Sequence, residues 1–333
     1  MNQQQDTVLS GIRSTGSLHL GNYFGALRNF VRLQDTHICY FFIADYHSLT
    51  THSVPEDLHH NVRRVLAEYI ASGIDPDKCT LYVQSDVPEI CELYLLLNMI
   101  AYTGELERTT TFKDKIRQQP GNINAGLLTY PVLMASDILI HRANWVPVGK
   151  DQEQHLELAR VFARRFNNIY NCNIFPEPEA FNFGANLVKV PGLDGTGKMG
   201  KSEGNAINLT DAPDVIRKKV MKAVTDTGPA EPNQEPPEPV QNLFTIMRLV
   251  SKPETEAFFR EQYAQCSIRY GDMKKQLAED VVICLTPIRE KFEQIMNDKD
   301  YLGKVAASGR DKARASAVKT MNEVRKAIGI RTI

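Results

Sequence analysis

Mostly apolar runs separate stretches of helical periodicity along the first two thirds of the chain. The runs cover residues 7–11, 38–44, 80–84 and 146–149. Short runs in which neighbouring positions are both apolar are typical of strands that are buried on both faces of a parallel sheet. The pattern therefore predicts four such strands.

Apolar residues between these runs recur every three or four positions, as expected for helices. The predicted helices cover residues 22–34, 58–73, 91–102 and 151–166. Alternating strands and helices predict an α/β fold with a doubly wound parallel sheet, Rossmann-like and of the HUP type. Ligands bind beyond the carboxyl ends of the strands in such sheets, and polar or glycine-bearing segments follow each strand here, at residues 10–11, 45–47, 84–86 and 149–152.

Only helical patterns follow after about residue 202. They cover residues 211–224, 240–250, 253–264, 269–297 and 309–328, and a proline-rich acidic loop lies at 231–239. We therefore expect an α/β domain at residues 1–205, an all-helical domain at 206–310 and a basic C-terminal helix at 311–333. From Gly303 onward there are eight Lys or Arg residues against two acids.

Composition narrows the class of protein. A length of 333 residues suggests two domains, and contents of 42% apolar and 24% charged residues are ordinary for a globular protein. A net charge of -1 restricts any nucleic-acid contact to a local basic patch. No apolar run reaches 18 residues and no signal-like segment begins the sequence, which predicts a cytoplasmic protein without a membrane span. The six cysteines form no C-x-x-C pair, so their spacing favours neither a zinc site nor an iron–sulfur cluster.

A glycine turn at residues 16–22 (Gly-Ser-Leu-His-Leu-Gly-Asn) connects the first predicted strand to the first helix. The N-terminus of a helix presents free N–H groups to phosphate, and glycine lets a ligand approach the backbone. His19 and Asn22 would add side-chain contacts to phosphate oxygens. An ordinary turn with an incidental histidine would also fit the four residues 19–22 (His-Leu-Gly-Asn), so this turn alone does not establish a site.

A lysine loop at residues 198–202 (Lys-Met-Gly-Lys-Ser) is the second candidate element. When a carboxylate attacks an α-phosphate, charge develops on the phosphoryl oxygens and the departing pyrophosphate, and two lysines can stabilise it. A flexible surface turn is the alternative. The spacing does not match a P-loop, which requires G-x-x-x-x-G-K-[ST]. The glycine turn and the lysine loop in this order predict one site for carboxylate activation by ATP.

Together the two elements resemble the HIGH and KMSKS signatures of class I aminoacyl-tRNA synthetases. From end to end, the chain resembles the bacterial-type tryptophanyl-tRNA synthetases of that class. Three further blocks, at residues 103–108, 127–139 and 146–160, carry this resemblance. The related tyrosyl enzymes share the two signatures and the fold, but not these blocks.

The resemblance implies a two-step ligase. ATP would activate L-tryptophan to tryptophanyl-adenylate and pyrophosphate, and the amino acid would then pass to the 3′ end of tRNA(Trp). The implied catalytic residues are His19, Asn22, Lys198, Lys201 and Ser202. The implied ATP contacts are Arg13, Ser14, Thr15, Gly21, Asn22, Gly149, Lys150, Asp151, Val190, Lys198, Met199, Gly200, Lys201 and Ser202. Mg²⁺ would be held mainly by the ATP phosphates and water, with no ligand from protein side chains.

The tryptophan pocket needs one acceptor in an apolar wall, because the only polar group of indole is its N–H donor. Tyr130, Met134 and Asp137 would share one face of a helix. The resemblance implies that Asp137 accepts the indole N–H and that Met134 packs on the ring. It also implies tryptophan contacts from Leu9, His47, Tyr130 and Gln152. Each of two residues has an alternative interpretation. Asp137 could be a helix carboxylate that pairs with a nearby cation, and His47 could be a histidine at the end of a strand with no role in binding.

Several positions depart from the commonest family pattern. Arg13-Ser14-Thr15 stands where Gln-Pro-Ser is common, Gly200 replaces the serine of KMSKS, and Lys150 replaces a frequent Glu. Arg13 adds a charge near the expected triphosphate. We interpret these changes as a lineage variant of an active enzyme, because both loop lysines, Asp137 and Gln152 are present.

The resemblance also implies a homodimer, with residues 91–102 as a candidate interface, and a helical domain whose basic tail contacts the anticodon region of the tRNA. A solvated helix face is the alternative for the basic tail. Two other functions remain open from the sequence. One is a tyrosine-specific synthetase, and the other is a non-catalytic relative that binds tryptophan or RNA.

Overall fold

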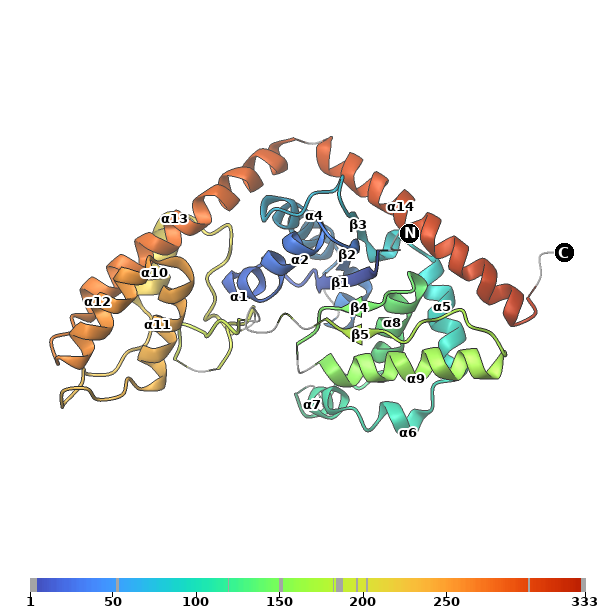
Figure 1. Ribbon diagram of the computed structural model, residues 1–333, viewed down its shortest axis with the longest axis horizontal. Coiled ribbons are helices and arrows are strands. Elements are labelled where there is room, and N and C mark those ends of the chain that lie inside the picture. The colour runs from blue at the N-terminus through green and yellow to red at the C-terminus, as the bar shows by residue number, and fades with distance from the viewer. Residues whose placement is uncertain are drawn as a thin grey trace.

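A computed structural model gives the structure of the protein. It describes residues 5–51, 54–118, 120–149, 152–181, 183, 188–195, 197–201, 203–298 and 300–330. Figure 1 shows an arched molecule, with a sheet and its helices on one side and a group of helices on the other.

Within the described residues, a five-stranded sheet has the order β3–β2–β1–β4–β5, with every pair parallel. The strands are β1 (Thr7–Arg13), β2 (Ile38–Ala44), β3 (Thr80–Val83), β4 (Trp145–Val146) and β5 (Glu179–Ala180). The strand order reverses between β1 and β4, which is where doubly wound sheets bind ligands. The predicted doubly wound parallel sheet is confirmed. The apolar runs located four of its strands, but the two exposed residues of β5 carry no such signal.

Alternate side chains of the strands enter two different cores. Val8, Phe41 and Leu81 face one core, whereas their neighbours Leu9, Phe42 and Tyr82 face the other. The first core is covered by α1 (Leu20–Asn22), a π-helical turn (Tyr23–Leu27), α2 (Arg28–Leu33) and α4 (Pro55–Ala71). The second core is covered by α5 (Glu89–Asn98), α6 (Thr103–Leu106), α8 (Ala125–Ile140) and α9 (Glu153–Ile169), with α7 (Thr110–Gln118) packed on α8. This two-sided burial explains why the strands read as continuous apolar runs.

Short helical turns follow two strands at the ligand-binding edge. They are α3 (Asp45–Ser48) with a 3₁₀ turn (Leu49–Thr51) after β2, and a 3₁₀ turn (Gln84–Asp86) after β3. These turns bring polar side chains to the carboxyl ends of the strands.

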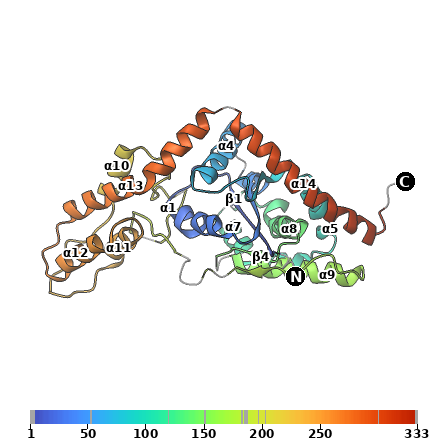
Figure 2. The same ribbon diagram turned by 45° about the horizontal axis from the view of Figure 1, so that its top comes forward.

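The C-terminal part is helical, as predicted. It contains α10 (Pro213–Met221), α11 (Glu238–Val250), α12 (Pro253–Ala264), α13 (Tyr270–Asn297) and α14 (Tyr301–Ala327). Helix α13 packs on both α10 and α4, so the first core continues from the sheet into the helical part. Figures 1 and 2 both show α13 and α14 as the two arms of an inverted V above the sheet.

Helix α14 lies across the edge strand β3. Leu302 and Val305 contribute to the first core, and Met321 and Val324 to the second. Gly309 sits at the crossing, where an added Cβ would lie only 1.7 Å from the carbonyl oxygen of Leu81. The predicted domain boundary after residue 310 falls inside this helix. The division of the chain into domains at 1–205, 206–310 and 311–333 stays a prediction.

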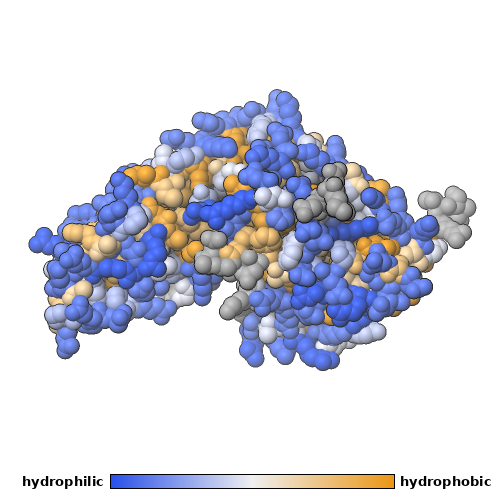
Figure 3. All heavy atoms as spheres, viewed as in Figure 1, coloured by the Kyte–Doolittle hydropathy of each residue, from blue (hydrophilic) through white to orange (hydrophobic). Residues whose placement is uncertain are grey.

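The surface of α5 carries apolar side chains. Leu95 on α5 is 56% exposed, and Met99, which directly follows the helix, is 71% exposed. Figure 3 shows apolar surface at the end of the molecule where α5 lies. Among the described residues, no helix has both the length and the apolar character needed to cross a membrane.

Candidate active site

A cavity of about 410 Å³ opens at the carboxyl ends of β1, β2 and β4. Its walls combine apolar side chains, such as Phe42 and Ile138, with a few polar ones. The cavity brings together eight of the residues proposed from sequence: Leu9, Arg13, His47, Tyr130, Met134, Asp137, Gly149 and Gln152. An apolar cavity with few polar groups is the usual form of a small-molecule site.

Helix α8 supplies one wall of the cavity. Tyr130, Met134 and Asp137 all line it, as their helical spacing predicts. Asn124 begins this helix by accepting a hydrogen bond at 3.1 Å from the backbone N–H of Leu127. The three side chains therefore come from one rigid element.

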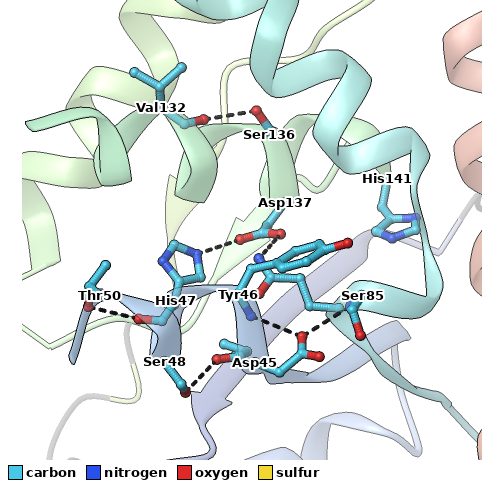
Figure 4. A network of polar contacts seen from close by, with 12 residues as sticks. Asp45, Tyr46, His47, Ser48, Thr50, Ser85, Val132, Ser136, Asp137 and His141 are labelled. Atoms are coloured by element: carbon cyan, nitrogen blue, oxygen red, sulfur yellow. Dashed lines mark hydrogen bonds and ion pairs between the residues drawn. The ribbon is translucent and has the colours of Figure 1, made fainter. Parts of the chain in front are cut away.

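The Asp137 carboxylate is the central acceptor in this wall. It is 1% exposed and accepts hydrogen bonds from His47 Nε2 at 2.9 Å and Gln84 Nε2 at 2.8 Å. Figure 4 shows the imidazole of His47 pointing at this carboxylate. Burial raises the pKa of Asp137 above its ordinary value, while the bonds from His47 and Gln84 oppose that rise. Each carboxylate oxygen can accept a further hydrogen bond, so the acid can also meet a donor in the cavity.

Gln84 is a site residue that the sequence alone did not identify. It follows β3 and its side chain is fully buried. Its position at the end of a strand was the available signal, but nothing local connects it to Asp137, 53 residues away.

A second set of polar contacts connects α8 with Gln152 at the edge of the cavity. The Tyr130 hydroxyl forms a short hydrogen bond with His155, and the other ring nitrogen of His155 donates to Gln152 Oε1 at 2.9 Å. These bonds fix the orientation of Tyr130 and Gln152, which we expect, together with His47, beside the charged groups of an amino acid.

Backbone pairing joins the glycine turn to the segment that follows the lysine loop. Leu20 N donates to Ile207 O at 3.0 Å, and Leu209 N donates to Leu18 O at 2.8 Å. The Lys201 ammonium donates to the carbonyl oxygens of Arg13, at 3.3 Å, and Gly16, at 2.9 Å. The two signatures, about 180 residues apart, therefore meet in one place, as the sequence predicts.

Burial depresses the pKa values of the basic groups at this junction. The pKa of Lys201 falls to about 8, chiefly through burial, against a rise caused by Glu68. The pKa of His19 falls to about 4, through burial and then through the charges of Lys201 and Lys198. His19 is therefore neutral at pH 7, and its buried Nδ1 has no hydrogen-bond partner among the described residues.

Arg13 connects the two parts of the site. It lines the cavity, and burial lowers the pKa of its guanidinium. Its buried Nε also has no hydrogen-bond partner within the described part of the chain. An orphaned donor in a polar site is costly unless a ligand satisfies it, which fits an anionic ligand here.

The other predicted ATP residues have mainly local contacts. Ser14 is bonded to Ser48, and Thr15 is half-buried in the turn. Asn22 Oδ1 accepts from the His19 N–H at 3.0 Å, which leaves its Nδ2 as the donor group. Gly21 packs near the Met199 side chain.

Two residues in the middle of the lysine loop have backbone N–H groups that are held by neighbouring segments. Met199 N donates to Val190 O at 3.0 Å, and Gly200 N donates to Asn205 Oδ1 at 3.0 Å. Val190 is buried beside Met199 and does not line the 410 Å³ cavity. Lys198 is exposed. Lys150, Asp151 and Ser202 lie outside the described residues.

The described residues contain no cluster of three or more His, Cys, Asp or Glu side chains suited to a metal ion. The polar groups of the site are instead a buried carboxylate, amides, histidines and cations. This set can bind an amino acid and stabilise phosphate charge.

Comparisons with known proteins agree with this geometry. The model of the family described as tRNA synthetases class I (W and Y) matches residues 1–286. A tryptophan–tRNA ligase of Porphyromonas gingivalis is 63% identical over 326 residues, which are 98% of this chain and 100% of the relative. One from Clostridium tetani is 42% identical over 334 residues, with 99% and 97% covered.

A solved structure of similar shape agrees as well. Tryptophanyl-tRNA synthetase from Campylobacter jejuni, complexed with ADP and tryptophan, gives a TM-score of 0.87 at 35% identity and covers 97% of this chain and 99% of that one. The family model, the relatives matched over nearly their full length and the similar solved structure all indicate a tRNA synthetase. The chain belongs to the class I tRNA synthetases of the tryptophan and tyrosine type.

Proposed function

We propose that this chain is a tryptophan–tRNA ligase that works in the cytoplasm. It activates L-tryptophan with ATP and transfers it to tRNA(Trp). The buried carboxylate of Asp137, held by two donors in the wall of a mostly apolar cavity, carries this proposal. Indole matches such a cavity because it is a large apolar ring with one N–H donor.

Asp137 gives the cavity its selectivity. A phenylalanine side chain has no donor, so it cannot make the further hydrogen bond to the buried carboxylate that the indole N–H makes, and this loss favours tryptophan. A tyrosine hydroxyl is a donor, so the apolar walls around Leu9, Phe42 and Met134 must exclude tyrosine by shape. Tyr130, His47 and Gln152 orient the ammonium and carboxylate of the substrate.

The first step needs no enzyme nucleophile. A tryptophan carboxylate oxygen attacks the α-phosphorus of ATP, a new O–P bond forms, and the bond to pyrophosphate breaks. The enzyme contributes position and charge. His19, Asn22 and Arg13 bind phosphate oxygens, while Lys198 and Lys201, with Ser202, stabilise the charge that develops on the leaving pyrophosphate.

ATP occupies the junction between the glycine turn and the lysine loop in this proposal. Gly21, Gly149, Lys150, Asp151 and Val190 hold the nucleoside, and Ser14 and Thr15 shape the turn. Mg²⁺ enters with ATP and is bound mainly by phosphates and water, which are its usual partners in nucleotide sites.

The second step uses the tRNA. The terminal ribose hydroxyl attacks the carbonyl carbon of the adenylate, and AMP leaves with its electron pair. The helical domain contacts the anticodon region, and two copies of the chain form a homodimer through the apolar surface of α5.

ATP–pyrophosphate exchange tests the activity and the role of Asp137 together. We expect exchange that depends on tryptophan more than on tyrosine. Asp137→Asn should lower kcat/KM for tryptophan by about 10- to 100-fold, because a hydrogen bond to a charged group contributes about 1.5–3 kcal/mol. The KM for ATP should change little.

Ser136→Ala is the matched control for this variant. Ser136 is buried on the same helix, but its hydroxyl donates to the Val132 carbonyl rather than lining the cavity. Stronger exchange with tyrosine would favour a tyrosine-specific enzyme. No exchange with either amino acid would favour a binding protein without catalysis.

A further inference from the structure

Glu68 on α4 is a carboxylate buried beneath the glycine turn. Its side chain is 0% exposed. The backbone N–H of Leu18 donates to its Oε2 at 2.8 Å, and Arg64 Nε donates to its Oε1 at 3.1 Å. A charge in such a place is costly unless its partners are retained, so both contacts constrain the groups that make them.

The bond from Leu18 acts directly on the glycine turn. Leu18 precedes His19, and its carbonyl oxygen accepts the pairing bond from Leu209. The peptide on each side of Leu18 is therefore fixed, by Glu68 at its N–H and by the later segment at its carbonyl. This arrangement sets the position from which His19 begins α1.

The charge of the same carboxylate also acts on Lys201. Its ammonium donates hydrogen bonds to the carbonyl oxygens of Arg13, at the end of β1, and of Gly16, in the turn that Glu68 holds. The charged and titratable groups that act at this place are Glu68 on α4, Arg13 at the end of β1, His19 in the glycine turn and Lys198 in the lysine loop. Burial raises the pKa of Glu68, while the hydrogen bonds from Leu18 and Arg64 and the charge of Lys201 oppose that rise. The negative charge of Glu68 in turn favours the protonated form of Lys201.

Arg64 connects Glu68 with the helical part of the chain. Its Nη2 forms a short hydrogen bond with the hydroxyl of Thr210, which lies just before α10. Its guanidinium carbon lies 5.5 Å from the centre of the Phe292 ring on α13. One side chain therefore touches Glu68, the segment after the lysine loop and the helical domain.

We propose that Glu68 and Arg64 are positioning residues for ATP in the first step. Glu68 fixes the Leu18–His19 backbone and supplies the counter-charge for Lys201, and Arg64 aligns Glu68 with the helical domain. This inference rests on the proposed function, because ATP is taken to bind at the same junction.

Glu68→Gln tests the role of the charge. Gln keeps the size of the side chain but can accept only one of the two hydrogen bonds. We expect the KM for ATP in the exchange reaction to rise about tenfold or more, because the variant loses one charge-assisted hydrogen bond. The KM for tryptophan should stay within about twofold of its original value. In a pH profile of the exchange reaction, kcat/KM for ATP should fall at alkaline pH, where Lys201 loses its proton. This alkaline limb should move to lower pH in Glu68→Gln, because Lys201 loses the anion that favours its protonated form.

Arg64→Lys separates position from charge. Lys retains a positive charge but loses the planar fork that reaches both Glu68 and Thr210. We expect this variant to raise the KM for ATP while the alkaline limb stays in place, because the Glu68 anion remains. It also keeps the proposal testable if Glu68→Gln does not fold.

Glu89→Gln is the matched control. Glu89 is 7% exposed and pairs with Arg314 at 2.7 Å, so this variant also breaks an ion pair between two elements, but far from the glycine turn. It should change neither the KM for ATP nor the alkaline limb. If Glu68→Gln behaves like Glu89→Gln in both measurements, Glu68 is only a structural acid and the proposal is wrong.

The two proposals can fail separately. If the unmodified protein shows no tryptophan-dependent exchange, the proposed function fails, and ATP binding measured by calorimetry still tests Glu68. Weaker ATP binding in Glu68→Gln than in Glu89→Gln would then support the positioning role. Equal binding in these two variants would overturn it.

Discussion

At the scale of single residues, burial rather than residue type determines the charge available at the candidate site. Lys201 and His19 are both basic, yet burial lowers the pKa of Lys201 to about 8 and that of His19 to about 4. At pH 7, Lys201 is therefore charged and His19 is neutral. The lysine can stabilise leaving pyrophosphate, while the histidine contributes a hydrogen bond without adding charge.

This difference predicts a pH dependence. As the pH rises through about 8, Lys201 loses its proton, so kcat/KM for ATP should fall between about pH 7.5 and 9. Lys201→Arg should remove this alkaline limb, although its rate will be lower, because a guanidinium stays protonated. The measurement is the pH profile of ATP–pyrophosphate exchange.

Lys198→Arg is the control for this prediction. Lys198 is exposed in the same loop, and its replacement should leave the alkaline limb in place. A limb with an unchanged midpoint in Lys201→Arg would show that another group titrates there.

At the scale of elements, α14 closes the edge of the sheet. An exposed edge strand offers unpaired backbone groups to other chains, and a covering helix removes this hazard. Close contact with β3 is possible because Gly309 has no side chain. The helix can then contribute to the cores on both faces of the sheet.

Gly309→Ala should force α14 away from β3. Overpacking of a core contact costs about 1–3 kcal/mol, so we expect the free energy of unfolding to fall by this amount. Urea denaturation with an unchanged m-value checks it. Gly303→Ala on the same helix is the control: it is exposed, a Cβ there would meet nothing within 4 Å, and alanine should stabilise the helix by up to about 1 kcal/mol. Equal effects of the two substitutions would contradict the close contact.

At the scale of the whole molecule, much of the basic C-terminal helix faces the protein itself. Arg314 pairs with Glu89 at 2.7 Å, Arg325 pairs with Glu92, and Lys312 donates to the carbonyl oxygen of Pro76. The charge count of the sequence therefore overstates the basic surface that α14 offers to RNA. These pairs instead attach α14 to α5 and to the loop before β3.

The apolar surface of α5 leads to a prediction about assembly. Met99→Asp would place a charge in the proposed dimer interface, where desolvation is unfavourable. We expect the dimer dissociation constant to rise at least about tenfold, which corresponds to 1.4 kcal/mol. Analytical ultracentrifugation measures this change.

Ile283→Asp provides the matched control for assembly. Ile283 is 70% exposed on α13, almost as much as Met99, but lies outside the proposed interface. It should leave the dimer intact. A dimer equally stable in both variants would place the interface elsewhere.

The sequence alone determined the features that depend on local periodicity. Apolar runs located β1 to β4, helical spacing placed Tyr130, Met134 and Asp137 on one face, and glycine and lysine patterns marked two phosphate elements. Short or exposed elements such as β5 and α3 gave no such signal, because too few of their residues are buried in a repeating pattern.

The tertiary structure decided which distant groups share one environment. His47 meets Asp137 across 90 positions of the sequence, and Glu68 meets Leu18 across 50. It also decided which charges are usable, since burial sets the pKa values of Lys201 and His19 and pairing occupies Arg314 and Arg325. The physical reason is that periodicity depends on neighbours along the chain, whereas burial and pairing depend on how strands and helices pack across it.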